Sequence, residues 1–118
     1  MKNKRIKEPE KTIQDAILQW LVLNKIKAFR INSGMIKTEK GGMVKLAPTG
    51  FSDIFGVLTG GRAFFIEVKT DKGKLTKFQT EFLGEMKELG AITIVARRIE
   101  DCEEIVKSRG AVTAGKRQ

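Results

Sequence analysis

The 118-residue chain is predicted to form one α/β domain with the element order α-β-β-β-α-β-α. Two observations predict the fold class: apolar residues recur at helical spacing over residues 10–24 and 77–89, and two short apolar runs, 54–58 and 63–69, flank Gly60-Gly61. A chain of this length can bury a single core. We expect one domain over residues 10–110, preceded by a flexible basic arm (1–9) and followed by a flexible tail (111–118).

The first helix is expected from about Glu10 to Asn24, with Ile13, Ile17, Trp20 and Leu21 on its apolar face. Pro9 and Glu10 suit a first helical turn, because proline lacks a donor that would be unpaired there and glutamate favours the positive end of the helix dipole. Residues 28–32 follow as a short strand.

Residues 33–52 are rich in glycine and are the least regular part of the chain. Residues 35–38 and 43–46 can pair as a small ribbon. A loop this long in a compact domain is usually functional or mobile, and the sequence leaves open a dimer arm or a flap that contacts DNA.

Residues 54–58 and 63–69 are predicted to form an antiparallel hairpin whose register decides where three charged residues point. A two-residue turn at Gly60-Gly61 would leave Asp53 on the face opposite Glu67. A three-residue loop, or a bulge at Gly56, would bring Asp53, Glu67 and Lys69 to one face.

A second helix is expected from about Lys77 to Leu89. Its apolar face comprises Leu75, Phe78, Phe82, Met86 and Leu89. Thr76 and Gln79 fit a capping box, and Gly90 is a natural stop. Residues 91–96 then read as a buried strand and 99–109 as a last helix.

Composition narrows the possible chemistry. The chain has no histidine, no tyrosine and a single cysteine, Cys102, which excludes histidine-based catalysis, a tyrosine nucleophile and a zinc site within one chain. We expect Cys102 to be a half-buried structural side chain. The remaining chemistry uses carboxylates, lysine and oxygen-binding metals such as Mg²⁺ or Mn²⁺.

The formal charge of +9 favours a polyanionic partner such as nucleic acid, although a generic basic surface would give the same count. The basic residues are spread along the chain, which suits contacts to a phosphate backbone better than a single sequence-reading helix. No apolar run approaches membrane-spanning length, and the N-terminus lacks the apolar region of a signal peptide. We therefore expect no membrane association and a cytoplasmic location.

Asp53 and the Glu67-Val68-Lys69 run carry the strongest chemical signal. Charged groups in an otherwise apolar strand are costly to bury unless they are paired or bind a metal. Two acids and a lysine brought together suit a divalent cation and a phosphate ester. The pattern therefore predicts a nuclease, provided that the hairpin does not use the two-residue turn or that Asp53 lies just outside the regular pairing.

The chain resembles the VRR-NUC (virus-type replication-repair nuclease) family of the PD-(D/E)XK restriction-endonuclease-like superfamily, in its stand-alone phage and bacterial form. The resemblance covers roughly residues 10–106, with Ser52 where the superfamily commonly has proline. The matching stretches are Glu10 with Ile13-Gln14, Phe29 to Gly34, Gly50 to Asp53, Gly60 to Arg62, Ile66 to Thr70, and Gly73 to Leu75 with Gln79.

The resemblance implies a mixed central sheet flanked by helices and a Mg²⁺- or Mn²⁺-dependent endodeoxyribonuclease. Asp53 and Glu67, with the carbonyl of Val68 and further help from Glu10, would hold one or two metal ions. Lys69 would orient or deprotonate the attacking water, or stabilise the transition state, and Gln79 would position Lys69 or that water.

The resemblance also implies a homodimer that acts in DNA repair or recombination on branched DNA, as a Holliday-junction resolvase does, leaving 5′-phosphate and 3′-hydroxyl ends. The predicted DNA contacts are Arg30, Lys72, Lys74 and Lys77. A flap or single-strand nuclease with the same core, and a non-catalytic nucleic-acid-binding module, stay open as alternatives.

Each site residue also has a plainer interpretation. Asp53 can cap a turn, Glu67 and Lys69 can form a solvated strand end, and Glu10 can act only on the helix dipole. Gln79 can serve only the capping box. Arg30 can simply flank the core, and Lys72, Lys74 and Lys77 can be a passive charged surface.

Overall fold

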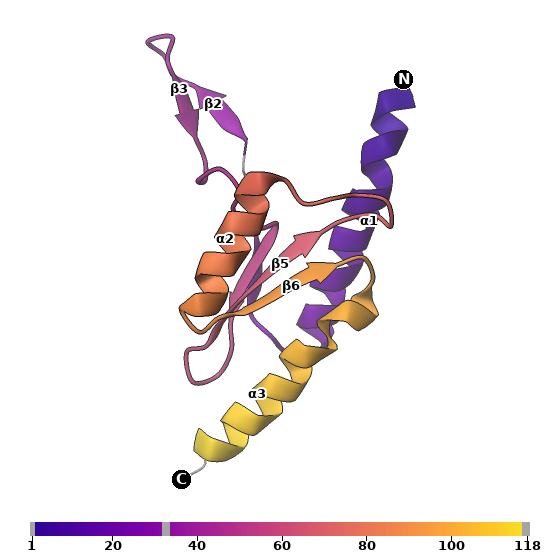
Figure 1. The fold of residues 1–118 in the computed structure, drawn as a ribbon, viewed down its shortest axis with the longest axis vertical. Coiled ribbons are helices and arrows are strands. Elements are labelled where there is room, and N and C mark those ends of the chain that lie inside the picture. The colour runs from indigo at the N-terminus through magenta and orange to yellow at the C-terminus, as the bar shows by residue number, and fades with distance from the viewer. Residues whose placement is uncertain (1, 32–33, 117–118) are drawn as a thin grey trace.

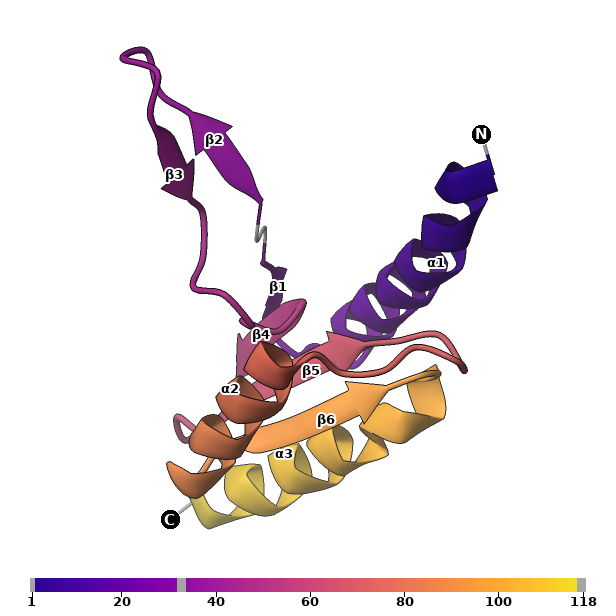
Figure 2. The same ribbon diagram turned by 45° about the horizontal axis from the view of Figure 1, so that its top comes forward.

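A computed structural model describes the backbone of residues 2–31 and 34–116, and the side chains of residues 9–31 and 34–109. It shows a mixed four-stranded sheet in the order β1-β4-β5-β6, flanked by helices, and a separate two-stranded sheet. The helices α1 and α3 lie on one face of the four-stranded sheet and α2 lies on the other (Figures 1 and 2). The predicted α/β class and the mixed, helix-flanked sheet are confirmed.

The first helix begins earlier than predicted. Helix α1 spans Lys2–Leu23 and includes Pro9, so the predicted helix start at about Glu10 is wrong. The flexibility of the basic arm over residues 1–9 stays a prediction. Proline removes one hydrogen bond within a helix, and the lysine- and glutamate-rich residues around it are good helix formers. The predicted apolar face is confirmed, because Ile17 and Leu21 are fully buried.

The central sheet is built from β1 (Ala28–Arg30), β4 (Ile54–Val57), β5 (Ala63–Val68) and β6 (Ile92–Ala96). Strand β4 pairs antiparallel with both β1 and β5, whereas β6 pairs parallel with β5 after the crossover through α2. Because side chains alternate along β5, Phe64, Ile66 and Val68 enter the core under α1, and Phe65 and Glu67 face α2.

The β4–β5 hairpin uses a three-residue loop, Thr59 to Gly61. Ile54 pairs with Ile66 and Val57 with Ala63, and the N–H of Leu58 donates to the carbonyl of Arg62 at 2.8 Å. Continuing this register by one residue sets Asp53 opposite Glu67. The two-residue turn is therefore not used, as the nuclease hypothesis requires.

Gly56 is not a bulge, because the pairing of β4 with β5 is continuous through it. A Cβ atom at this position would lie 2.2 Å from Cζ of Phe64 and 2.5 Å from the carbonyl oxygen of Lys27. Glycine is needed here to let the Phe64 ring lie flat against the strand.

The predicted ribbon is confirmed. Strands β2 (Met35–Lys37) and β3 (Met43–Lys45) pair antiparallel and form an arm that projects from the body (Figure 1). Its side chains are mostly exposed, including Met35, Ile36, Met43 and Val44. Its role as a dimer arm or a DNA flap stays a prediction.

Helix α2 spans Lys77–Glu88 and carries the predicted capping box, with the Thr76 side chain accepting from the Gln79 N–H and the Gln79 side chain accepting from the Thr76 N–H. A 3-10 turn, η1 (Ile99–Cys102), leads into α3 (Glu103–Lys116). The helix therefore continues seven residues past the predicted end at Arg109, which corrects that boundary. The flexibility of residues 111–118 stays a prediction. A hydrogen bond from Arg109 to the Asn24 carbonyl ties α3 to α1.

Cys102 is fully buried between the sheet and the helices, more deeply than predicted. Burial, followed by the nearby Asp101 charge, raises the pKa of the Cys102 thiol to about 12. The thiol is therefore protonated and shielded at neutral pH. Over the described residues, no helix is both long and apolar enough to cross a bilayer.

Candidate active site

Asp53 is held by the backbone of two neighbouring strands. Its Oδ2 atom accepts a hydrogen bond from the Val68 N–H at 2.8 Å, and its carbonyl oxygen accepts from the Ile31 N–H at 2.8 Å. The carboxylate therefore has a fixed position at the end of β5. It does not merely cap a turn, which was the plainer interpretation of this residue.

Glu67 is the central buried acid. The residue is 2% exposed, its Oε2 atom accepts from Nε2 of Gln79 at 3.0 Å, and Nζ of Lys69 lies 3.7 Å from the same oxygen. The Oε1 atom is buried and has no hydrogen-bond partner among the described residues. A solvated strand end is thus excluded for Glu67.

The carboxyl groups at this site repel one another. Burial, and then the charge of Asp53, raise the pKa of Glu67 to about 8, and Lys69 opposes the shift. A hydrogen bond between the Asp53 and Glu67 carboxyls forms only when one of them is protonated, so the unprotonated pair leaves Oε1 of Glu67 unpaired. Burial and the Asp53 charge therefore favour a proton, or positive charge in addition to that of Lys69, at this pair.

Glu10, which belongs to α1, lies close enough to Asp53 and Lys69 for their charges to shift its pKa. Partial burial, and then Asp53, raise the pKa of Glu10, whereas Lys69 lowers it. Glu10 is therefore more than a residue at a helix terminus, since α1 begins at Lys2. Its role as a metal ligand stays a prediction.

Lys69 and Gln79 are both fixed at the acid pair. The Lys69 N–H donates to the Ala96 carbonyl at 3.0 Å, and only 12% of its side chain is exposed. Gln79 forms the predicted capping box, with Oε1 accepting from the Thr76 N–H at 2.9 Å, and its Nε2 donates to Glu67. The capping box thereby aims the Gln79 amide at the site. Its predicted role in positioning Lys69 or the attacking water stays a prediction.

The donor set suits Mg²⁺ or Mn²⁺. Among the described side chains, no group of three histidine, cysteine, aspartate or glutamate residues is placed to hold a metal. Mg²⁺, however, usually binds one or two protein carboxylates and completes its shell with water and substrate phosphate. Asp53 and Glu67, with an unpaired buried oxygen on Glu67, meet that requirement, and the Val68 carbonyl is adjacent in sequence.

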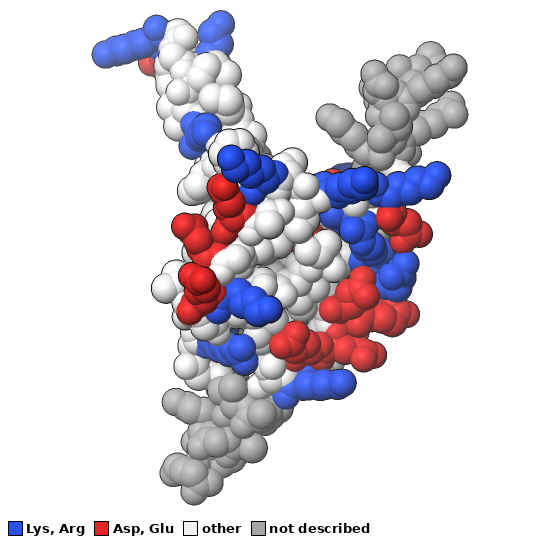
Figure 3. Space-filling view, viewed as in Figure 1, with Lys and Arg blue, Asp and Glu red and all other residues white. Residues whose placement is uncertain are grey.

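The predicted DNA contacts differ in their environments. Arg30 forms an ion pair with Asp15 of α1, so its charge is partly neutralised. Lys72, Lys74 and Lys77 are exposed on the segment that leads from β5 into α2, and none forms an ion pair with a described acid. The face in Figure 3 carries basic side chains over the arm and the upper part of the body, and a mixture of acidic and basic ones over α2 and around η1.

Arg97 is a residue whose role the sequence did not reveal. Its Nη1 atom donates to the carbonyls of Thr70, Asp71 at 3.2 Å and Gly73 at 2.9 Å, and so orders the loop that carries Lys72 and Lys74. Val68 pairs with Ala96 in the parallel ladder, which places Arg97 beside Lys69. Predicting the parallel pairing of residues 64–68 with 92–96 would have indicated that Arg97 lies beside Lys69.

Comparisons with protein-family models, with curated proteins and with solved structures find no match to this chain. The geometry of the site is therefore the basis on which a function can be assigned to this chain. Asn32 and Ser33, which belong to the resembling stretches, lie outside the described residues.

Proposed function

We propose that the chain is a metal-dependent DNA endonuclease with a restriction-endonuclease-like core of the VRR-NUC type. The observation that carries the proposal is the pair of acids formed by half-buried Asp53 and fully buried Glu67, with an unpaired Glu67 oxygen and the Lys69 ammonium alongside. An acid pair of this kind is unstable by itself, because both groups cannot ionise at low cost. A bound divalent cation removes that cost.

Asp53, Glu67 and the Val68 carbonyl are the groups that would hold Mg²⁺ or Mn²⁺, with Glu10 as a further ligand, direct or through water. When bound, the ion supplies positive charge for the phosphate and lowers the pKa of water. Lys69 orients or deprotonates the attacking water, or stabilises negative charge on the phosphate. Gln79 fixes the orientation of the Glu67 carboxylate through its 3.0 Å hydrogen bond.

The proposed substrate is branched DNA, and the proposed products carry 5′-phosphate and 3′-hydroxyl ends. The positive charge of +9 and the exposed lysines next to β5 support contacts to the phosphate backbone. A homodimer would present two such sites across a two-fold axis, which suits paired cuts in a four-way junction. The projecting β2–β3 arm, with exposed apolar side chains, offers contact surface for a second copy.

The test is cleavage of labelled linear, flapped and four-way DNA by the purified chain with Mg²⁺, with Mn²⁺ and with EDTA. We expect metal-dependent cutting, with the four-way substrate preferred and dimers in light scattering. Asp53→Asn abolishes cutting, whereas Asp71→Asn, which changes an exposed acid bound to Arg98, leaves it intact. Cutting that persists in Asp53→Asn, or none with any substrate and metal, would contradict the proposal. A monomer at micromolar concentration would remove the paired-cut model.

A further inference from the structure

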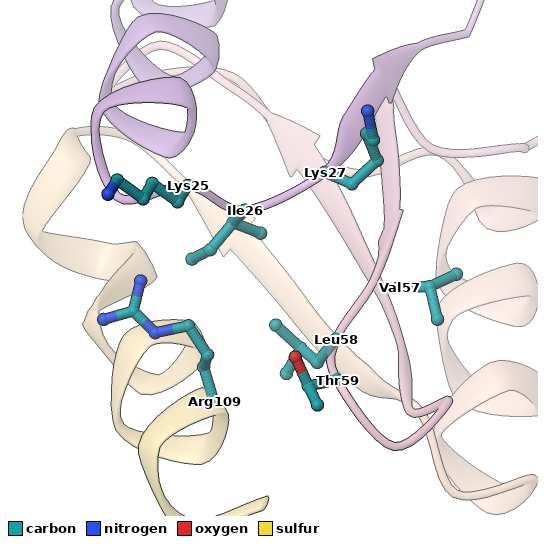
Figure 4. Close-up of a pocket in the computed structure, with 7 residues that line it drawn as sticks. All are labelled: Lys25, Ile26, Lys27, Val57, Leu58, Thr59 and Arg109. Carbon is teal, nitrogen blue, oxygen red and sulfur yellow. The ribbon is translucent and has the colours of Figure 1, made fainter. Parts of the chain in front are cut away.

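A small basic cavity lies at the end of the sheet remote from the candidate active site. Its volume is about 130 Å³, and it is lined by the turn after α1, the end of β4 and α3 (Figure 4). Ile26 and Leu58 form its buried apolar part. Because β4 starts beside Asp53 and ends at Val57, the cavity and the acid pair lie at opposite ends of this strand.

The positive charges at this cavity are not neutralised by any acidic side chain that the structure describes. Lys25, Lys27 and Arg109 line it together with Thr59, and the lining contains no acid. None of these three cations forms an ion pair with an acid among the described side chains. Figure 4 shows the charged ends of Lys25 and Arg109 on the same side of the cavity, with Lys27 pointing away from them. Like charges arranged in this way attract an anion.

Lys25 holds its position at a conformational cost. Its φ angle is 60°, and every other positive φ in the described backbone belongs to glycine. Lys25 comes directly after the helical turn at the end of α1, where glycine is the favoured residue. A lysine there costs about 1 kcal/mol relative to glycine. A backbone outlier of this kind points to a use for the side chain.

Arg109 has donors to spare for a ligand. One of its N–H groups donates to the Asn24 carbonyl, which satisfies the end of α1. A guanidinium carries five N–H donors, so most remain available to an anion. Its planar fork matches the oxygens of a phosphate group.

We infer that this cavity is a second, non-catalytic site, which binds a backbone phosphate of the nucleic acid on which the chain acts. The volume of the cavity suits a phosphate group and excludes a whole nucleotide. The helix from Glu10 to Leu23 is about 20 Å long, so this phosphate is a different one from that at Asp53 and Glu67. The identification of the polyanion as DNA rests on the proposed function, whereas the anion site itself rests on Lys25 and Arg109.

The test uses Lys25→Gly, which removes the charge and relieves the positive φ, so the fold is preserved. The matched control is Lys87→Gln, which removes one charge from α2. DNA affinity is measured by fluorescence anisotropy in EDTA, over a series of salt concentrations. We expect Lys25→Gly to melt at the same temperature or higher, to bind DNA roughly five-fold more weakly, and to lower the slope of log K against log salt by about 1.

Equal DNA affinities for Lys25→Gly and Lys87→Gln would overturn the inference. So would a site that responds to inorganic phosphate in a Lys25-dependent way while DNA affinity is unchanged, because the ligand would then be a free anion. The cleavage panel distinguishes failure of this inference from failure of the proposed function. If the parent chain cuts DNA and Lys25→Gly binds DNA as tightly as the parent, only the second site is refuted. Lys25-dependent DNA binding without cutting refutes only the nuclease.

Discussion

Oδ2 of Asp53 accepts a hydrogen bond from the backbone N–H of Val68, the residue that follows Glu67, at 2.8 Å. Strand β5, which carries Glu67, thus fixes the side chain of Asp53. This bond makes the distance between the two carboxylates a property of the sheet, so both act as a preorganised pair.

Asp53→Asn and Lys69→Ala are expected to lower the rate of DNA cleavage by about 10²-fold or more. Both groups touch the reacting phosphate or its metal in the proposed mechanism, and neither supplies a large share of backbone contacts. DNA affinity should therefore change little. Single-turnover cleavage and anisotropy on the same substrate measure the two effects, with Asp71→Asn as control. A parallel loss of affinity and rate would indicate that these residues only bind DNA.

The stability of the metal-free chain should fall as pH rises from about 4.5 to about 8. Unfolded Glu67 releases its proton near its usual pKa of 4.5, whereas burial and Asp53 raise the folded pKa to about 8. Between these values the folded chain holds more protons than the unfolded one, so the free energy of unfolding decreases with pH. The full penalty is present above pH 8.

Glu67→Gln removes this penalty and tests it. In EDTA at pH 8 the variant should be more stable than the parent by at least about 1.4 kcal/mol, the equivalent of one pKa unit. At pH 4 the pH-dependent part of this difference in stability should be absent, and only a constant offset caused by the substitution should remain. Urea denaturation at both pH values is the measurement. A difference between the two chains that is the same at both pH values would show that Glu67 titrates normally.

Mn²⁺ or Mg²⁺ should raise the melting temperature of the parent chain at neutral pH. A ligand present at 100 times its Kd stabilises the folded state by about 2.7 kcal/mol. Asp53→Asn and Glu67→Gln should lose the shift, and Asp71→Asn should keep it. Equal shifts in all four chains would place the metal elsewhere. Differential scanning fluorimetry measures these shifts in melting temperature, with Ca²⁺ as a further ion for comparison.

Thr76→Ala and Gln79→Ala separate the two uses of Gln79. Each should destabilise the chain by about 1 kcal/mol, since each breaks the capping box. Only Gln79→Ala also removes the hydrogen bond to Glu67. Its cleavage rate under saturating DNA should fall well below that of Thr76→Ala, with DNA affinity unchanged. Equal rates for the two variants would assign Gln79 to the cap alone.

The hairpin and the second helix could be predicted because their signals are local. Gly60 and Gly61 both adopt positive φ in the loop, and the Thr76–Gln79 spacing set the start of α2. The arm was likewise predictable from its two short apolar runs. Convergence of Asp53 with Glu67 depended on loop length, which the sequence narrowed to two possibilities without deciding between them.

The errors lie where long-range contacts or weak local preferences decide the structure. Pro9 suits the first turn of a helix, yet α1 begins at Lys2 and continues through it. The extension of α3 past Arg109 has no strong periodic signal. Arg97 orders the loop after Lys69 through hydrogen bonds to backbone carbonyls more than 20 residues away in sequence. Local sequence patterns do not predict hydrogen bonds over such separations.

The burial of Cys102 makes spectroscopy on this chain simpler. Its sulfur is inaccessible and the chain has no second thiol, so maleimide dyes or nitroxide labels will react with a newly introduced surface cysteine and leave the native one untouched. A single cysteine placed at Lys40, at the tip of the arm, would thus report its position by energy transfer or electron paramagnetic resonance without further changes to the background.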